Sequence, residues 1–403
     1  MRCSIKMVYA CARDQTFWLA RRTVKILHVI PSADPVSGGP IEFVTRLAAQ
    51  LVTEGHCIHL VSLDEPVANG EIGQFASVTR LGRGVFGYRL NLRLIRWLRA
   101  HAGEFDAIVV DGLWQFHGAA ALVALGFRGI RYHVFSHGML DPWFKRTYPL
   151  KHMKKLIYWL VIERQLLKRA ASVIFTCETE RLMARGSFPF YRVKEAISVL
   201  GTAPASGAVL EGRSRADISS ERKRILYLSR IHEVKGVELL IEAFASLKEA
   251  LANYDLVIAG PGKASLVASL KALASTLGVA DRVAWCGMVR GGEKWALLRS
   301  AEVFCLPSHQ ESFGMAVIEA LACGVPVLIT NKVNIWREIT ASSAGFADED
   351  TVDGIRRMIV QWVTLSETDR EQMQRAARLC FDTKFHIEKA SASYLAVLNR
   401  QEP

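Results

Sequence analysis

The feature that most constrains the fold is an alternation of short apolar segments with helix-length segments, which runs through the chain twice. The apolar segments are rich in Val, Ile and Leu, as in "VKILHVI" at 24–30 and "RILYLS" at 224–229. Such segments, separated by helices, are typical of parallel sheets that are buried on both faces. The predicted strands are 24–30, 57–63, 106–110, 131–136, 172–176 and 197–200 in the first half, and 224–229, 255–260, 282–287, 303–307 and 326–330 in the second.

The two series of strands are separated by residues 203–221, "APASGAVLEGRSRADISSE", which are rich in Ala, Ser, Gly and charge and have no periodicity. Such a composition is typical of a linker. We therefore predict an α/β protein with two doubly wound domains. Because open parallel sheets bind ligands at the carboxyl ends of their strands, the cleft between the domains is the expected site. The predicted division is an N-terminal extension 1–23, a first domain 24–203, a linker 204–221, a second domain 222–383 and a C-terminal helix 384–403.

The cysteines and the hydropathy pattern bear on where the protein works. The eight cysteines include no C-x-x-C pair, and several lie in apolar runs such as "VFCLP", so we expect reduced core thiols and a cytosolic setting. No apolar run approaches the roughly 18 residues of a membrane span. The apolar stretch near the N-terminus is interrupted by Arg13 and Asp14, unlike that of a signal peptide.

The excess positive charge lies in the first half of the chain. The sequence carries 51 Lys and Arg against 39 Asp and Glu, and the whole net charge of +12 falls within residues 1–200. It concentrates in 80–101 and in 143–170, where aromatic and aliphatic residues are interleaved with the basic ones. Such segments bind anionic lipid surfaces, although charged helix faces are also common on ordinary globular proteins. We predict a membrane or acceptor contact through Lys145, Arg146, Lys151, Lys154 and Lys155.

The segment "PSHQESFGMAVIEALACGVPV" at 307–327 carries the most specific chemistry. It follows a predicted strand, and its glycine at 314 opens an apolar helix that ends before Pro326. The free N–H groups and the dipole at a helix start favour an anion. Glu311 precedes the helix and Glu319 lies within it, and a carboxylate can accept two hydroxyl hydrogen bonds. Two carboxylates flanking a phosphate site suit a nucleotide-diphosphate sugar.

This segment resembles the signature of the retaining glycosyltransferases of family 4, in which two glutamates are separated by seven residues. Other segments are similar to that family: "SGGP" at 37–40, "LSRIHEVKGVELLIEAF" at 228–244, "AGPG" at 259–262 and "CGMV" at 286–289. "HGMLDPW" at 137–143 resembles members that build bacterial surface polysaccharides. The resemblance implies the GT-B fold: two Rossmann-like domains that face a cleft, with a C-terminal helix that returns to the first domain.

The resemblance also implies roles for individual residues. Glu311 would hold the hydroxyls of the donor sugar and Glu319 the ribose, while Arg230 and Lys235 would neutralise the diphosphate. His137 matches the family's cleft histidine beside the reacting carbon. The catalytic set implied is His137, Glu311, Arg230 and Lys235, and the donor-binding set is Gly38, Gly39, Gly262, Met288, Phe313, Gly314, Met315 and Glu319.

The implied mechanism is transfer with retention by front-face attack, in which the leaving diphosphate accepts the proton of the acceptor. We expect no cofactor and no metal, because Arg230, Lys235 and a helix N-terminus already supply positive charge. The string "DED" at 348–350 could be read as a manganese site. Its place before "TVDGIRRM" indicates acids that cap a helix start instead.

The predicted reaction moves a hexose from GDP-mannose or a UDP-sugar to a lipid-linked, lipopolysaccharide or exopolysaccharide acceptor at the inner face of the cytoplasmic membrane. A sugar-nucleotide epimerase of the same fold is a rival, which the paired glutamates disfavour. A non-catalytic nucleic-acid-binding protein is another alternative, but the basic first half carries no binding motif, so we expect no nucleic-acid partner. A nicotinamide-dependent dehydrogenase is disfavoured because "PSADPVSGGPIEF" lacks the G-x-G-x-x-G pattern.

Overall fold

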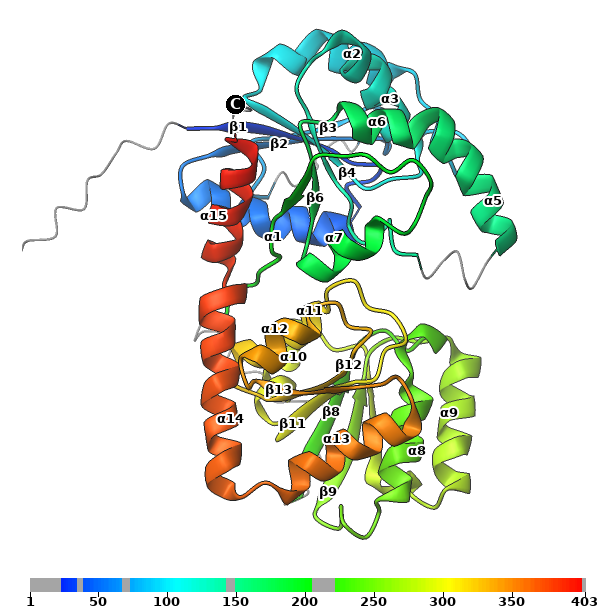
Figure 1. Ribbon diagram of the computed structural model, residues 1–403, viewed down its shortest axis with the longest axis vertical. Coiled ribbons are helices and arrows are strands. Elements are labelled where there is room, and N and C mark those ends of the chain that lie inside the picture. The colour runs from blue at the N-terminus through cyan, green and yellow to red at the C-terminus, as the bar shows by residue number, and fades with distance from the viewer. Residues whose placement is uncertain (1–22, 35–38, 67–72, 143–148, 205–221, 401–403) are drawn as a thin grey trace, which may run out of the picture.

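The computed structural model describes residues 23–34, 39–66, 73–142, 149–204 and 222–400. They form two parallel sheets, one above the other in Figure 1. The first sheet has the strand order β3-β2-β1-β4-β5-β6-β7. Its strands are β1 (Lys25–Val29), β2 (Cys57–Ser62), β3 (Ser77–Arg80), β4 (Ala107–Asp111), β5 (His133–Phe135), β6 (Ser172–Phe175) and β7 (Glu195–Ile197).

The second sheet has the order β10-β9-β8-β11-β12-β13, and all its pairings are parallel. In both sheets the chain starts in the middle and winds outward to each side, so the prediction of two doubly wound domains is confirmed. The strands are β8 (Lys223–Leu228), β9 (Tyr254–Ala259), β10 (Val283–Gly287), β11 (Val303–Leu306), β12 (Val327–Thr330) and β13 (Gly345–Asp348).

Two edge strands, β3 and β13, were not expected from the sequence. The side chains of β3 are all partly exposed, and those of β13 are partly exposed after Gly345. A strand at the edge of a sheet pairs with one neighbour and is partly exposed to solvent, so it needs no continuous apolar run. The hydropathy pattern therefore does not reveal it. The acids at 348–350 are therefore not simple helix caps. Asp348 ends β13 and pairs with Arg357, while Thr351 caps the following helix through its side chain.

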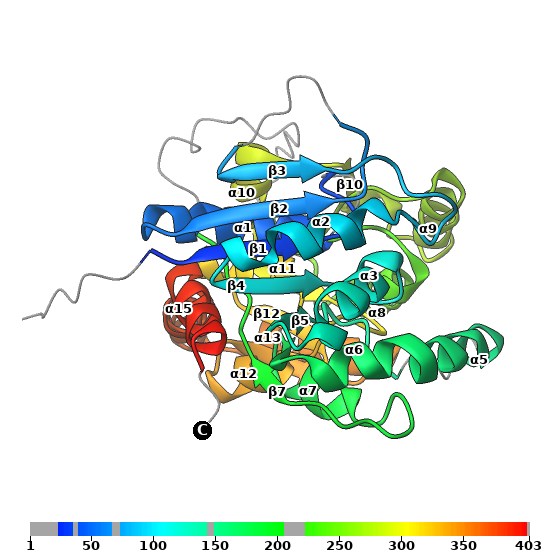
Figure 2. The same ribbon diagram turned by 90° about the horizontal axis from the view of Figure 1, so that it is seen from above.

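Helices flank both sheets, as seen from above in Figure 2. Central strands such as β4, β6, β9 and β12 are buried along their whole length, which explains their uninterrupted apolar sequences. The first domain contains α1 (Gly39–Thr53), α2 (Arg93–His101), α3 (Phe116–Ala124), α5 (Pro149–Tyr158), α6 (Arg164–Arg169) and α7 (Glu178–Ala184). The second contains α8 (Val237–Ser246), α9 (Ala264–Thr276), α10 (Gly291–Arg299), α11 (Met315–Ala322), α12 (Trp336–Ala341), α13 (Val352–Thr364) and α14 (Glu367–Cys380).

The last helix, α15 (Ile387–Leu398), crosses back to the first domain, as the red helix in Figure 1 shows. A π-helical turn at Phe381–Phe385 connects it to α14, which packs against α11 of the second domain. Helix α15 packs against α1 and β7, and backbone hydrogen bonds join Thr202 to Phe385 and Ile387. The expected return of the C-terminal helix is confirmed. The linker predicted at 204–221 lies almost wholly outside the described residues.

Candidate active site

The cleft side of the second domain centres on an ion pair between Lys235 Nζ and Glu311 Oε2, both largely shielded from solvent. Lys235 ends a 3-10 turn after β8, and Glu311 lies in the loop after β11. The two loops are joined by a backbone hydrogen bond from His309 to Val234 at 2.9 Å. Gly236 has a positive φ of 63°, and a Cβ there would lie 2.2 Å from the carbonyl oxygen of Pro307. Only glycine allows this approach, which holds the lysine against the glutamate.

Helix α11 begins beside this pair. Gly314 has a φ of 89° and precedes the first helical residue, Met315. None of the described hydrogen bonds uses the backbone N–H of Met315 or Ala316, so these groups are open to an anion. The side chain of Phe313 is buried and packs edge-on against Phe385. Phe313 can therefore serve a donor through its backbone only.

Glu319 lies inside α11 but is buried, with 4% of its surface exposed. Its Oε1 pairs with Arg46 Nη1 at 3.0 Å and with Lys294 Nζ at 2.7 Å. Arg46 belongs to α1 of the first domain, so the pair joins the two domains. Burial disfavours the charged guanidinium, but Glu319 and Glu42 outweigh it and raise the pKa of Arg46. Both of these ion pairs use Oε1, which leaves Oε2 as the oxygen that a ligand hydroxyl can reach.

Three further strand ends of the second domain meet at the same edge of the sheet. Arg230 is exposed just after β8. Gly262, after β9, touches Ile231 so closely that a Cβ would lie 2.7 Å from the Cβ of Ile231. Met288, after β10, is half exposed. The structure thus brings these residues to one edge with Lys235, as predicted for parallel strands.

On the facing domain, His137 follows β5 with a positive φ of 48°. Its ring stacks on Phe135 with centroids 4.4 Å apart and meets Phe43 edge-on. Its Nε2 lies 2.9 Å from Oδ1 of Asp111, the last residue of β4, which is fully buried. Burial opposes the charge of Asp111, yet His28 and His137 lower its pKa to about 2. The sequence analysis did not single out Asp111. Its only local sign is that it is an acidic residue at the end of an apolar run.

The loop that carries His137 reaches across to the second domain. Gly138 has a φ of 76°, and a Cβ on it would lie 2.1 Å from Oγ and 2.6 Å from Cβ of Ser312. Gln310 Nε2 donates to Asp141 Oδ2 at 3.0 Å beside this contact. Ser312 follows Glu311 directly, so the structure places His137 and Glu311 on opposite walls of one cleft.

The buried carboxylate of Glu180 anchors the loop from behind, and the sequence did not single it out. Its Oε1 accepts hydrogen bonds from Ser136 Oγ at 2.6 Å and from the backbone N–H of Gly138 at 2.8 Å. Its Oε2 accepts from the N–H and the hydroxyl of Thr176. A carboxylate with four donors fixes the backbone on both sides of His137.

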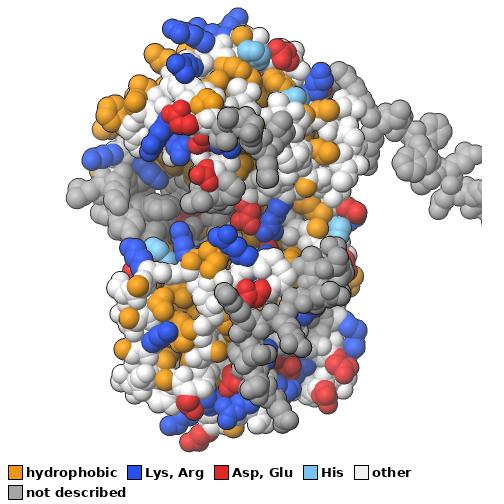
Figure 3. Space-filling view, turned by 180° about the vertical axis from the view of Figure 1, so that it is seen from behind, with side chains coloured by type: hydrophobic (Ala, Val, Ile, Leu, Met, Phe, Trp, Pro, Cys, Tyr) orange, Lys and Arg blue, Asp and Glu red, His pale blue; other side chains and the backbone are white. Residues whose placement is uncertain are grey.

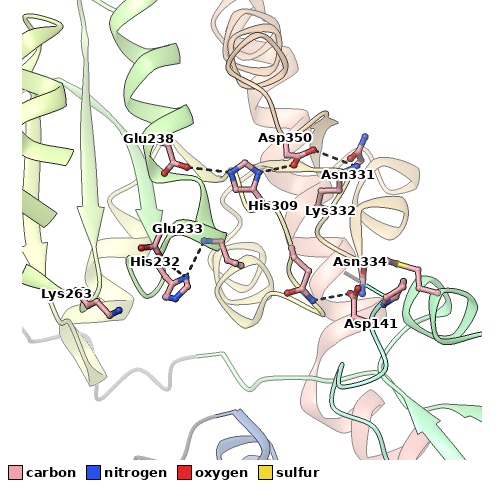
Figure 4. A pocket seen from close by; sticks show the side chains of 14 residues that line it. Asp141, His232, Glu233, Glu238, Lys263, His309, Asn331, Lys332, Asn334 and Asp350 are labelled. Atoms are coloured by element: carbon pink, nitrogen blue, oxygen red, sulfur yellow. Dashed lines mark hydrogen bonds and ion pairs between the residues drawn. The ribbon is translucent and has the colours of Figure 1, made fainter. Parts of the chain in front are cut away.

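A cavity of about 860 Å³ opens between the domains next to this loop. Figure 4 shows its polar lining, in which His309 lies between Glu238 at 3.5 Å and Asp350 at 2.9 Å. The hydrogen bond to Glu238, with that to Asp350, raises the pKa of His309 to about 9. The lining comes from both domains and comprises Asp141, Pro142, Met183, His232, Glu233, Val234, Glu238, Lys263, His309, Gln310, Asn331, Lys332, Asn334 and Asp350.

The remaining predicted residues are only partly placed. Gly38, Lys145 and Arg146 lie outside the described residues, as does the side chain of Lys151. Gly39 is exposed at the start of α1, and Lys154 is exposed on α5. Lys155 is only partly exposed, and its Nζ lies 4.7 Å from the ring centre of Trp114. Burial lowers the pKa of Lys155. Within the described ranges, no cluster of three or more His, Cys, Asp or Glu side chains could hold a metal ion.

Comparison with known proteins supplies the family. Residues 211–379 match the family "Glycosyl transferases group 1", and residues 38–196 match the "Glycosyl transferase 4-like domain". The chain is similar to D-inositol 3-phosphate glycosyltransferase of Salinispora tropica, with 34% identity over 34% of this chain and 30% of that protein. It is also similar to mannosylfructose-phosphate synthase of Agrobacterium fabrum, with 35% identity over 32% of this chain and 30% of the relative. These alignments thus span about a third of the length of the curated relatives.

Solved structures share the whole fold. Sucrose-phosphate synthase from Thermosynechococcus elongatus superposes with a TM-score of 0.71 and 18% identity over 93% of this chain and 98% of its own. Anabaena HepE in complex with UDP and glucose superposes with a TM-score of 0.72 and 15% identity over 94% of this chain and all of its own. These are two-domain GT-B proteins. The two family matches run from residue 38 to residue 379 with one short gap at the linker, and the chain therefore belongs to the group 1 glycosyltransferases, with a glycosyltransferase 4-like first domain.

Proposed function

We propose that the protein transfers a hexose from a nucleotide-diphosphate sugar, GDP-mannose or a UDP-sugar, to a glycan or lipid-linked glycan acceptor with retention of configuration. The observation that carries the proposal is the Lys235–Glu311 pair at the start of α11, faced across the cleft by His137. A cation, free helix N–H groups and a carboxylate at one point suit a diphosphate joined to a polyhydroxyl group. Family membership favours transfer over epimerisation and over nucleic-acid binding.

Each part of the donor has a matching group. Arg230, Lys235 and the N-terminus of α11 neutralise the diphosphate, while Glu311 accepts hydrogen bonds from the sugar hydroxyls. Glu319 Oε2 accepts a ribose hydroxyl, with Arg46 and Lys294 holding the other carboxylate oxygen. The loops at Gly262 and Met288 line the base with backbone groups. Anabaena HepE was solved with UDP-glucose, which supports a nucleotide sugar as the donor.

The transfer itself needs no covalent enzyme intermediate. The bond between the anomeric carbon and the diphosphate oxygen breaks, and the acceptor oxygen forms its bond on the same face of the sugar. The proton of the acceptor hydroxyl passes to the leaving diphosphate. The role of Arg230, Lys235 and the α11 N–H groups is to stabilise the negative charge that grows on that diphosphate. Fixed positive groups of this kind replace a metal ion.

The cavity beside the donor groups suits the acceptor. Carboxylates, amides and cations line it from both domains, including Asp141, Glu233, Asn331 and Lys332. Because such groups include both hydrogen-bond donors and acceptors, they fit the hydroxyls of a glycan. Figure 3 shows basic and acidic side chains on both sides of the boundary between the domains. WaaG, a solved structure named for lipopolysaccharide biosynthesis, has the same fold at a TM-score of 0.59, which agrees with a glycan acceptor.

The proposal is tested with a panel of nucleotide sugars in the presence of EDTA. We expect slow hydrolysis of one UDP- or GDP-sugar without acceptor, and an undiminished rate in chelator, because the diphosphate charge is met by side chains and helix N–H groups. Release of nucleotide is measured by chromatography, and the anomeric configuration of a transfer product by NMR. Turnover that is lost in EDTA and restored by Mn²⁺ contradicts the metal-independent mechanism. Absence of hydrolysis with every donor contradicts the proposed function itself.

We also infer that α5 and the turn after it contact an anionic membrane. Figure 2 shows α5 projecting from the edge of the first domain. Met153, Ile157 and Val161 recur every four residues there and are 58%, 67% and 63% exposed. Exposed apolar side chains on one helix face beside exposed Lys154 form a typical interfacial surface. No helix in the described part of the chain is long and apolar enough to cross a membrane.

Vesicle sedimentation tests this contact. We expect the protein to pellet with phosphatidylglycerol vesicles at low salt and to be released at high salt, since each Lys or Arg near the surface adds about 1 kcal/mol within a Debye length. Changing Lys145, Arg146, Lys151, Lys154 and Lys155 to Gln, or Ile157 and Val161 to Ser, should weaken pelleting severalfold. Leu379→Ser, at an equally exposed apolar residue of α14, is the matched control. If all variants pelleted equally, α5 would be an ordinary solvent-exposed helix with no role in membrane binding.

A further inference from the structure

A continuous set of hydrogen bonds runs from the C-terminal helix to the cleft histidine. Tyr394 Oη on α15 lies 3.2 Å from His28 Nε2 on β1. His28 Nδ1 lies 2.7 Å from Asp111 Oδ2, and Asp111 Oδ1 lies 2.9 Å from His137 Nε2. Tyr394, His28 and Asp111 are all buried. The four groups come from α15, β1, the end of β4 and the loop after β5, so no local sequence pattern joins them.

The chemistry of Asp111 determines how the protons are placed. Its pKa is lowered to about 2, so the carboxylate is ionised and can only accept hydrogen bonds. Both imidazoles must therefore donate: Nδ1–H of His28 to one oxygen and Nε2–H of His137 to the other. Burial, with the charge of Asp111, raises the pKa of Tyr394 well above its ordinary value, so the phenol keeps its proton. The O–H of Tyr394 then donates to Nε2 of His28, whose Nδ1–H is directed at Asp111.

This arrangement leaves one nitrogen of His137 for the cleft. Within the described residues, Nδ1 of His137 makes no hydrogen bond, and it is not among the fully buried unpaired atoms. The tautomer with the proton on Nε2 has its lone pair on Nδ1, the ring nitrogen that does not contact Asp111. The partner of one imidazole nitrogen decides which nitrogen carries the proton, so Asp111 selects this form.

We propose that Tyr394 and His28 are positioning residues that, through Asp111, fix the ring orientation and protonation pattern of His137. The proposal rests on the proposed function, in which His137 borders the reacting sugar. Helix α15 is joined to α14 of the second domain through the π-helical turn at Phe381–Phe385. The hydrogen bond from Tyr394 therefore also links the tautomer of His137 to the packing of α15 on the first domain. The hydrogen bond from His28, whose ring is itself held by Tyr394, opposes rotation of the Asp111 carboxylate away from His137.

Other titratable groups near this set of hydrogen bonds do not compete for the Asp111 carboxylate. His117 on α3 points Nε2 at the carbonyl oxygens of Asp111 and Gly112, and burial lowers its pKa to about 4, so it stays neutral. The carboxylate of Glu180 is occupied by hydrogen bonds from Ser136, Gly138 and Thr176. Among the described residues, the side chains that hydrogen-bond the Asp111 carboxylate are those of His28 and His137.

The first measurement uses the ligand-free protein and needs no activity. Long-range nitrogen–proton NMR of histidine-labelled protein, with the signal assigned by its loss in His137→Asn, should show the Nε2–H form of His137. In Tyr394→Phe we expect a mixture of the two tautomers of His137. His28→Asn keeps an N–H donor near the Nδ1 position and should retain most of the Nε2–H form, whereas His28→Leu should lose it.

Kinetics provide the second measurement. We expect Tyr394→Phe to lower kcat by about fivefold and His28→Leu by at least about tenfold, with nucleotide affinity unchanged because the donor-nucleotide groups lie on the other domain. Tyr132→Phe is the matched control. It also removes one buried hydroxyl, which donates to the carbonyl of Leu166, but Tyr132 does not belong to the set of hydrogen bonds that leads to His137. An Nδ1–H form in the native protein, or a Tyr394→Phe variant that matches Tyr132→Phe in tautomer and kcat, would overturn the proposal. The NMR measurement does not depend on turnover, so it tests the proposal even if no nucleotide sugar is a substrate.

Discussion

Replacing Lys235 with alanine is expected to lower kcat/KM by about 10²–10³, the loss seen when one preorganised group at a developing negative charge is removed. Its ammonium lies against Glu311 at the start of α11, where the diphosphate oxygen would gain charge as the glycosidic bond breaks. The loss should fall mainly on kcat, since Arg230 and the α11 N–H groups still bind the ground-state diphosphate. Turnover and calorimetric nucleotide binding, measured on the same variant, separate the two effects.

Lys223 offers a matched control for this variant. It lies at the opposite end of β8 and also pairs with a glutamate, Glu302, at 2.9 Å. Lys223→Ala should leave kcat/KM within about twofold of the native value, since exposed ion pairs contribute little. Lys235→Arg should recover part of the loss because it restores a charge but not the geometry of the ammonium. If Lys235→Ala behaves like Lys223→Ala, the diphosphate is not bound at this pair.

Gly138→Ala is expected to abolish most transfer while the second domain still binds nucleotide. The new Cβ would lie 2.1 Å from Ser312 Oγ and 2.6 Å from Ser312 Cβ, so the two walls of the cleft must separate. A displacement of about 1 Å at a reacting centre costs on the order of 10²-fold in rate. The left-handed backbone adds about 1–2 kcal/mol of strain to the folded state. Turnover, nucleotide affinity and thermal unfolding are the three measurements.

Two further variants distinguish the effect of backbone strain at Gly138 from the effect of the clash with Ser312. Gly129→Ala carries the same left-handed backbone, with a φ of 70°, but its Cβ would meet nothing within 4 Å. It should lower the unfolding temperature and leave turnover intact. Ser312→Gly, added to Gly138→Ala, removes the atoms that clash and should restore much of the lost turnover. A double variant as inactive as Gly138→Ala would mean that the close approach of the two loops is not what transfer requires.

The central strands and the donor motif were predictable because their information is local. A strand such as Val327–Thr330, buried on both faces, needs an uninterrupted apolar run, and Gly314 before α11 is needed for a positive φ at the helix start. The edge strands β3 and β13 were missed because partial exposure removes that signal. The role given to the acids at 348–350 was wrong in detail for the same reason, since Asp348 belongs to β13.

Local sequence patterns were enough to predict the two parallel sheets, most of their strands and the residue types at the ends of β8 and β11. Hydrophobic periodicity and backbone preference act over a few residues, so a short window of sequence carries them. Which separate groups meet depends instead on the folded arrangement: Arg46 contacts Glu319, Asp111 contacts His137 and Tyr394 contacts His28. Each of these contacts depends on how separate segments pack against one another, whether they are 26 residues apart, as Asp111 and His137 are, or 366, as His28 and Tyr394 are. Packing of this kind leaves no pattern in either segment alone.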